Sequence, residues 1–284
     1  MGFMSAMKAN KAYRLHRSGN TEEAVRLYEE AFAEGLNEPR FILSYALMII
    51  RDGQYQKARE FLVKHQKAPG MTQTQRIELL VYYATCCFRL GNVDKGISTL
   101  EQQFRKTETG LLYQTLGYLY VVKYDRENTP DFAALKEAEN AQTEAPETPE
   151  TANEESAEVK DGEPVLSPEE AWNAGIEKAE EFIRNSVEYD EEDPVCLDNM
   201  AQFYYRVRGD RTAAKEWFDK AIERKNNQID TLYFLSRYDL EAGNREAALE
   251  KLEKAAEGRF SPLNYCDRET IRAEIENLKG AQQE

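Results

Sequence analysis

The stretch that decides the fold occurs twice, as RSGNTEEAVRLYEEA at residues 17–31 and as EAGNREAALEKLEKA at residues 241–255. In each copy a Gly-Asn pair is followed by Ala five residues after the glycine, by a large side chain four residues later, and by a second Ala after three more. Glycine readily adopts the left-handed conformation that ends a helix, and asparagine is a frequent N-cap. Each stretch therefore predicts the turn between two helices.

The same turn recurs at a nearly constant period. Gly19, Gly53 and Gly91 are 34 and 38 residues apart, and Gly209 and Gly243 are again 34 apart. Five residues after each glycine the side chain is small, and nine residues after it the side chain is large. The small positions are Ala24, Ala58, Gly96, Ala214 and Ala248, and the large ones are Tyr28, Leu62, Leu100, Phe218 and Leu252. Because a spacing of four puts both on one helical face, a partner helix can approach at the small residue. The period predicts stacked helical hairpins.

These motifs are similar to those of the tetratricopeptide-repeat family, whose pattern is W-x2-L-G-x2-Y, then A-x3-F, then Pro. The segment YQTLGYLY at residues 113–120 has Tyr113 at the Trp position, followed by Leu116, Gly117 and Tyr120. The segment AAKEWFDKA at residues 213–221 supplies Ala214, Phe218 and Ala221. The resemblance implies an all-α, right-handed α-solenoid of about six helix-turn-helix repeats.

The repeat boundaries follow from this register. We expect units at residues 4–38, 39–71, 72–108, 109–193, 194–227 and 228–261. Some positions depart from the pattern, because Gln202 and Ser236 replace a small apolar residue and His65 and Gln103 replace the last Ala. The tail at residues 267–280 places Ile271, Ile275 and Leu278 on one face, as expected of a C-terminal capping helix.

An insertion interrupts the fourth unit. The segment AENAQTEAPETPETANEESAEVKDGEP at residues 138–164 is rich in Glu, Ala, Thr and Pro and has no aromatic residue. Such a composition predicts disorder, and Ser167, Pro168 and Glu170 then predict a capped helix start. We therefore expect N-terminal repeats at 1–124, an acidic disordered insertion at 125–166, and C-terminal repeats with the capping helix at 167–284.

Charge differs along the chain. The 284 residues carry a net charge of −15, divided as +4 over residues 1–125, −9 over 126–168 and −10 over 169–284. The overall negative charge disfavours nucleic acid and anionic membrane as partners. The longest apolar run, FILSYALMII at residues 41–50, is too short to span a bilayer. With four cysteines in no CxxC pair and no segment of signal-peptide character, a cytoplasmic protein is expected.

Sequence motifs for chemistry are absent. There is no P-loop, GxGxxG, GxSxG or HExxH motif, and neither His16 nor His65 has a second ligand at a helical spacing. The acidic stretch EYDEEDP at residues 188–194 lacks the order of a calcium loop and is expected to be a solvated turn. We expect no catalytic residues, no metal and no cofactor, and therefore no enzyme.

The remaining candidate site is the concave groove that the family resemblance implies, lined by the first helix of each hairpin. Its candidate partner-binding residues are Tyr13, Arg17, Leu43, Leu47, Ile50, Arg51, Val81, Thr85, Phe88 and Arg89. Arg17, Arg51 and Arg89 each lie two residues before a turn glycine. They could form a basic ladder that binds an acidic peptide, or they could only complement the helix dipole.

Three functions are open at this level. The first is a scaffold or adaptor that binds a peptide or helix of another protein in the groove. The second is a regulatory subunit whose acidic insertion modulates access to the groove. The third, an enzyme or nucleotide binder, has no motif in its favour. Neither the partner nor the oligomeric state follows from the sequence.

Overall fold

The computed structural model describes residues 3–143 and 166–280, and in these residues every regular element is a helix. The first three hairpins are α1 (Phe3–Arg17) with α2 (Thr21–Ala33), α3 (Pro39–Arg51) with α4 (Tyr55–His65), and α5 (Gln73–Arg89) with α6 (Val93–Phe104). The fourth pairs α7 (Gly110–Lys123) with α9 (Pro168–Tyr189) across the insertion. The last two are α10 (Pro194–Gln202) and η2 (Phe203–Arg208) with α11 (Arg211–Arg224), and α12 (Ile229–Glu241) with α13 (Arg245–Ala256). The predicted all-α solenoid is confirmed.

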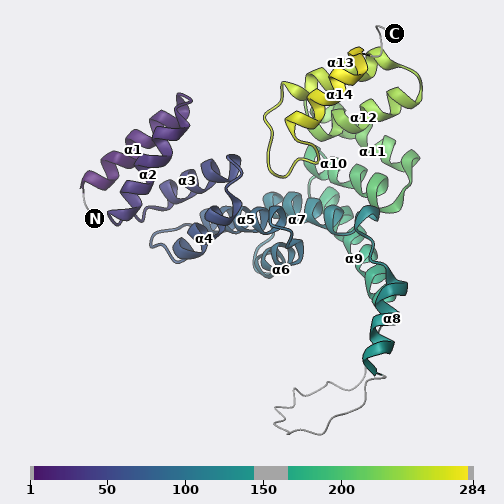
Figure 1. The fold of residues 1–284 in the computed structure, drawn as a ribbon, viewed down its shortest axis with the longest axis horizontal. Coiled ribbons are helices and arrows are strands. Elements are labelled where there is room, and N and C mark those ends of the chain that lie inside the picture. The colour runs from purple at the N-terminus through teal and green to yellow at the C-terminus, as the bar shows by residue number, and fades with distance from the viewer. Residues whose placement is uncertain (1–2, 144–165, 281–284) are drawn as a thin grey trace.

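Successive hairpins stack into a curved array (Figure 1). The hairpins that begin with α1 and α3 form one arm, those with α10 to α13 form the other, and α5 and α7 lie between the arms. The capping helix α14 (Arg268–Gly280) packs on α13, with Ile271 fully buried and with Ile275 and Leu278 against the same cluster. The predicted cap therefore covers the last apolar face.

The turn glycines and small residues explain this geometry. Gly19, Gly53, Gly91, Gly209 and Gly243 all have φ between 72° and 88°, the left-handed region that favours glycine. The predicted small and large positions after them are all buried. At one crossing, a Cβ added to Gly96 would lie 3.0 Å from the carbonyl oxygen of Ala84, so backbone meets backbone there.

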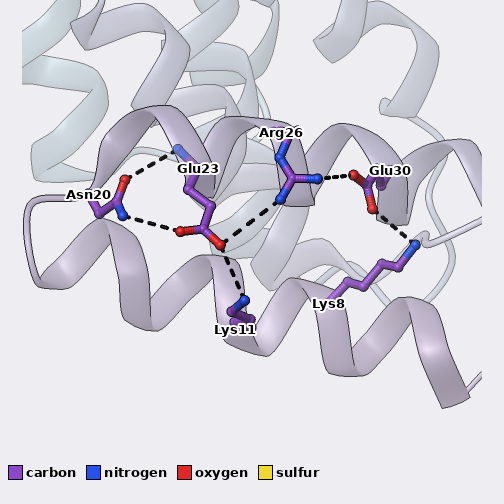
Figure 2. Close-up of polar contacts among 6 residues, drawn as sticks. All are labelled: Lys8, Lys11, Asn20, Glu23, Arg26 and Glu30. Carbon is purple, nitrogen blue, oxygen red and sulfur yellow. Dashed lines mark hydrogen bonds and ion pairs between the residues drawn. The ribbon is translucent and has the colours of Figure 1, made fainter.

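The first hairpin shows how polar side chains fix a turn (Figure 2). The side chain of Asn20 accepts the backbone N–H of Glu23 at 3.4 Å and donates to the Glu23 carboxylate at 3.2 Å. Glu23 also pairs with Lys11 of α1, and Arg26 pairs with Glu30 one turn further along α2. The pair between Lys11 and Glu23 links α1 to α2, whereas the cap and the pair between Arg26 and Glu30 act within α2. Exposed ion pairs each add little stability.

Three features differ from the sequence-based expectation. Residues 126–128 and 132–143, within the predicted disordered insertion, form the short 3-10 helix η1 (Arg126–Asn128) and α8 (Phe132–Thr143), while 144–165 lie outside the described residues. The expected cap at Asn244 forms no side-chain hydrogen bond, in contrast to Asn20, Asn92 and Asp210. The end of the first helix in the fifth hairpin widens into a π-helical turn, η2.

Candidate binding groove

The predicted groove residues divide into three groups by exposure. Tyr13, Arg17, Arg51 and Arg89 are exposed, whereas Leu47 and Phe88 are half-buried. The others are 2–6% exposed: Leu43, Ile50, Val81 and Thr85. Leu43 and Ile50 pack in the core cluster of the first two hairpins, so the exposed candidates are the arginines and Tyr13. Neighbouring helices cover the first helix of a hairpin on both sides. Fewer of its residues therefore reach the groove than the repeat register predicts.

Two of the predicted arginines meet in one pocket. Arg51 at the end of α3 and Arg89 at the end of α5 line a cavity of about 320 Å³ together with Arg259, Arg268 and Asp267. We call this the basic pocket. Arg17 is not among its lining residues. Two of the three predicted arginines thus line this pocket, together with two arginines from the far end of the chain.

The charged groups of the basic pocket have different environments. Arg268 donates to the carbonyl oxygens of Ala256 and Gly258, so it completes the C-terminus of α13. Arg89 Nε donates to the carbonyl oxygen of Pro262 at 2.7 Å. Arg51 and Arg259 form no hydrogen bond or ion pair with any described residue.

The one acid that lines the basic pocket is used at a helix start. Asp267 Oδ1 accepts the backbone N–H and the hydroxyl group of Thr270, both at 2.8 Å. These hydrogen bonds, assisted by the charge of Arg89, lower the pKa of Asp267. Asp267 therefore stays ionised, and a single negative charge stands against four guanidinium groups.

Burial and, after it, neighbouring positive charge lower the pKa values of two cationic groups on this side of the array. Burial, together with the charge of Arg259, lowers the pKa of Arg51. Burial also lowers the pKa of His16, with further contributions from Arg51 and Arg259. Positive groups from α1, α3 and the C-terminal part of the chain therefore converge on this side of the array.

The contributor that sequence reasoning missed is the segment between α13 and α14, residues 257–267, which we call the groove loop. It extends from the C-terminal arm toward α5 and α7 (Figure 1). Besides the bond from Arg89, its Leu263 packs against the cluster that contains Val81 and Tyr118, and its Tyr265 N–H donates to both carboxylate oxygens of Asp230. The only sequence signal is that residues 262–266 fit neither a repeat nor the cap.

A second cavity lies beneath the groove loop. It has a volume of about 410 Å³, and we call it the central pocket. Val81, Tyr118 and Leu263 contribute apolar surface, and Asp198, Gln228 and Asp230 contribute polar atoms. Asp198 and Asp230 are each 4% exposed, so two carboxyl groups line a largely desolvated cavity.

A buried polar network supports the central pocket. Arg206 Nε donates to Asp125 at 2.7 Å, and its Nη1 donates to Gln202 Oε1 at 2.8 Å. Gln202 in turn donates to Asp198 at 2.7 Å, and Thr231 Oγ1 donates to the other oxygen of Asp198 at 2.5 Å. Gln202, the departure from the repeat pattern, is thus the link between the two halves of this network.

Burial raises the pKa of Asp198 well above the ordinary value. Burial, and then the nearby charge of Asp198, raises the pKa of Asp230. Arg206 opposes both shifts, but it is already paired with Asp125. The site therefore disfavours the state in which both carboxyl groups are ionised.

Some functions have no support in the described part of the chain. Within residues 3–143 and 166–280, no cluster of three or more His, Cys, Asp or Glu side chains has a metal-binding arrangement. None of the helices described is both long and apolar enough to cross a membrane. The acidic turn contributes a helix cap instead, since Asp193 Oδ1 accepts the N–H groups of Val195 and Cys196.

Comparisons with known proteins agree with this fold. The family described as anaphase-promoting complex, cyclosome, subunit 3 matches residues 17–103. A thermophilic TPR protein of Thermus thermophilus superposes with a TM-score of 0.56 at 15% identity, covering 85% of this chain and 99% of that one. PilW, a type IV pilus biogenesis factor, superposes with a TM-score of 0.54 at 14% identity, covering 93% of this chain and 98% of that one. MamA from Desulfovibrio magneticus superposes with a TM-score of 0.51 at 17% identity, covering 80% of this chain and 98% of that one.

No curated protein matches the sequence. The glycine-marked period, the paired helices and these similarities together show that the chain contains repeats with the tetratricopeptide fold. Repeats of this class are generally protein–protein interaction modules and generally non-catalytic.

Proposed function

We propose that this protein is a non-enzymatic scaffold or adaptor that holds an acidic peptide segment of another protein in its concave groove. Residues 1–124 and 167–284 act as one binding surface, interrupted by the insertion at 125–166. The supporting observation is that Arg51, Arg89 and Arg259 line one pocket, although they come from α3, α5 and the groove loop.

The chemistry of the basic pocket favours an anion. Arg51 and Arg259 repel one another and form no ion pair with a described acid, so an approaching carboxylate offsets a repulsion and gains charge-assisted hydrogen bonds. Guanidinium groups suit carboxylates because their N–H donors match the two oxygens in a planar fork. The pocket is open to solvent, so the attraction is moderate and depends on salt.

The regulatory alternative has less support. Its acidic insertion includes residues 144–165, which lie outside the described part of the chain. The described beginning of the insertion, α8, contacts α9 and projects away from the two arms (Figure 1). None of the residues of α8 lines the basic pocket.

The cytoplasm is the compartment we propose, since all four cysteines are buried free thiols, as in reducing surroundings.

Fluorescence anisotropy with a labelled decapeptide of glutamate tests the proposal. We expect the double variant Arg51→Glu with Arg89→Glu to weaken binding by at least about tenfold at low salt, because two attractions become repulsions. Raising the salt to about 1 M should remove most of the difference, since the Debye length falls to about 3 Å.

The matched control is Arg272→Glu, which makes the same charge change at an exposed position of α14. A glutamine decapeptide controls for binding by the backbone. Equal weakening by Arg272→Glu, or equal affinity for the glutamine peptide, would contradict a specific acidic site.

A further inference from the structure

The buried polar network beside the central pocket, to which Asp198 and Asp230 of its lining belong, contains more negative than positive charge. Asp125, Asp198 and Asp230 are 6%, 4% and 4% exposed, and Arg206, 8% exposed, is the one buried guanidinium that faces them among the described residues. Arg206 is committed to Asp125 at 2.7 Å. Asp198 and Asp230 are therefore left with neutral hydrogen-bond donors only. A buried charge without a counter-ion is costly unless a proton or a cation neutralises it.

The pocket also has hydrogen-bond acceptors that are not used. Tyr118 lines the cavity, is 5% exposed, and its hydroxyl group forms no hydrogen bond with any described residue. Gln228 donates through Nε2 to the carbonyl oxygen of Pro194, but its Oε1 is buried without a partner among the described residues. Each carboxylate oxygen pair offers about four lone-pair sites. Asp198 accepts from Gln202 and Thr231 and also has the Gln228 amide beside it, and Asp230 accepts the Tyr265 N–H and has the Asn264 amide beside it. These donors leave part of the acceptor capacity of each carboxylate unused.

We propose that the central pocket binds the guanidinium group of an arginine side chain presented by a partner segment. The guanidinium is placed between Asp198 and Asp230, with further N–H bonds to Gln228 Oε1 and the Tyr118 oxygen. A guanidinium has five donors and no acceptor, which matches a cavity whose free polar atoms are acceptors. A guanidinium is also more weakly hydrated than an ammonium group, so it loses less hydration free energy when it enters a buried site.

The shape of the pocket fits a side chain rather than a bare ion. Its volume of about 410 Å³ is much larger than a metal ion needs, and its walls at Val81 and Leu263 are apolar. Those walls can cover the methylene stem of arginine while the acceptors hold its end. The cations that line the rim, Lys225 and Arg259, are exposed and so are screened by water.

This inference rests on the proposed function only for the source of the arginine. Together the two pockets define a partner with an acidic anchor at the basic pocket and an arginine anchor under the groove loop. Arg259 lines both cavities, so the two anchors are adjacent. A small guanidinium compound tests the central pocket without the partner, and its failure would leave the acidic-peptide test untouched.

The experiment is an NMR titration of the full chain with three probes that differ only at the side chain. They are the N-acetyl methylamides of arginine, lysine and norleucine. We expect the arginine probe to bind with a dissociation constant of about 1–10 mM, as suits one anchor, and to shift amides near Asp198, Asp230 and Tyr265. The lysine probe should bind several-fold more weakly, and the norleucine probe should give no saturable shift. Equal binding of lysine, equal binding of norleucine, or no shift with arginine would each overturn the inference.

Variants locate the site. The double variant Asp198→Asn with Asp230→Asn should weaken the arginine probe by at least about tenfold, because both charges that attract it are removed, whereas Glu246→Gln, an exposed acid on α13, should not. If circular dichroism shows that the double variant is unfolded, Tyr118→Phe decides instead, because it removes only the free hydroxyl. A several-fold loss with Tyr118→Phe supports the inference, and an unchanged affinity overturns it.

The pH dependence gives a second readout. Because protons compete with the guanidinium for the carboxylates, affinity should rise several-fold from about pH 5.5 to about pH 8. The titratable and charged groups that face the two carboxylates are Tyr118, Asp125, Arg206, Lys225, Arg259, Tyr265 and Cys266. A flat profile would mean that the probe does not bind at Asp198 and Asp230.

Discussion

At the scale of single residues, one departure from the repeat pattern lies at the polar centre of the molecule. Gln202 stands where the pattern expects a small apolar side chain, and it is fully buried between Asp198 and Arg206. Ser236, the second departure, is also fully buried and donates to the carbonyl oxygen of Tyr233 at 2.6 Å. Buried polar groups persist only where they find partners. Gln202 therefore finds its partners in an internal network, whereas Ser236 finds its partner within its own helix.

Asp230 gives the residue-scale prediction. Its folded-state pKa is raised, so the folded chain binds a proton more readily than the unfolded chain between about pH 4 and about pH 7. Stability contributed by this group is present at low pH and is lost as the pH rises through that window. We expect the free energy of unfolding of Asp230→Asn, measured relative to wild type, to rise by roughly 1–3 kcal/mol between about pH 5 and about pH 8. The reason is that the amide carries no charge to bury.

Urea unfolding followed by circular dichroism at both pH values measures this difference. Glu246→Gln again serves as the control, since that side chain is exposed. A difference between variant and wild type that stays constant with pH would show that Asp230 titrates normally. Asp198 and Arg206 face Asp230, so the measurement reports the network as well as the single group.

At the scale of elements, the helix crossings depend on small residues. Ala214 of α11 is fully buried four residues before Phe218, in the cluster that also contains Ala201 of α10. Packing at such a crossing is dense, and added methyl groups have no cavity to fill. The register predicted from glycine spacing can therefore be tested by enlarging one small residue.

We expect Ala214→Leu to lower the free energy of unfolding by about 1–3 kcal/mol, because the larger side chain separates α10 from α11. Thr212→Leu is the matched control, since Thr212 is an exposed residue of the same helix. Thermal unfolding of both variants measures the effect. An unchanged midpoint for Ala214→Leu would mean that Ala214 is not at a tight crossing.

At the scale of the whole molecule, the groove loop joins the C-terminal arm to α5 and α7, which lie between the two arms. Its backbone accepts a hydrogen bond from Arg89 of the third hairpin and donates one to Asp230 of the sixth, and Leu263 packs among residues of α5 and α7. Contacts between hairpins that are not neighbours are unusual in a solenoid, where each repeat mainly contacts the next. The loop therefore restricts how far the C-terminal arm can move away from α5 and α7.

Weakening this bridge should loosen the molecule without unfolding the repeats. We expect the double variant Arg89→Ala with Leu263→Ser to lower the free energy of unfolding by about 1–3 kcal/mol, because one charge-assisted hydrogen bond and one apolar contact are lost. Small-angle X-ray scattering should show a larger radius of gyration while the helix content stays constant. An unchanged radius would show that stacking of the repeats alone fixes the arms, and Arg272→Ala on α14 controls for loss of a surface arginine.

The sequence by itself determined the hairpins, because each depends on local chemistry. A glycine with positive φ, a cap and a small residue five positions later act within one turn or one crossing, so a fixed period is enough to predict them. It also placed Arg51 and Arg89 on one side of the array. The helix within the insertion, α8, and the π-helical turn η2 were missed, since neither has a periodic signal.

Only the tertiary structure decided which distant groups meet. Arg259 joins Arg51 from the opposite end of the chain, and Asp198, Asp230, Tyr118 and Arg206 meet from four different elements. Their positions follow from the summed rotation of several repeats and from the path of the groove loop. A repeat period predicts contacts between adjacent repeats. Both pockets are formed by residues of repeats that are not adjacent, so only the tertiary structure brings these residues together.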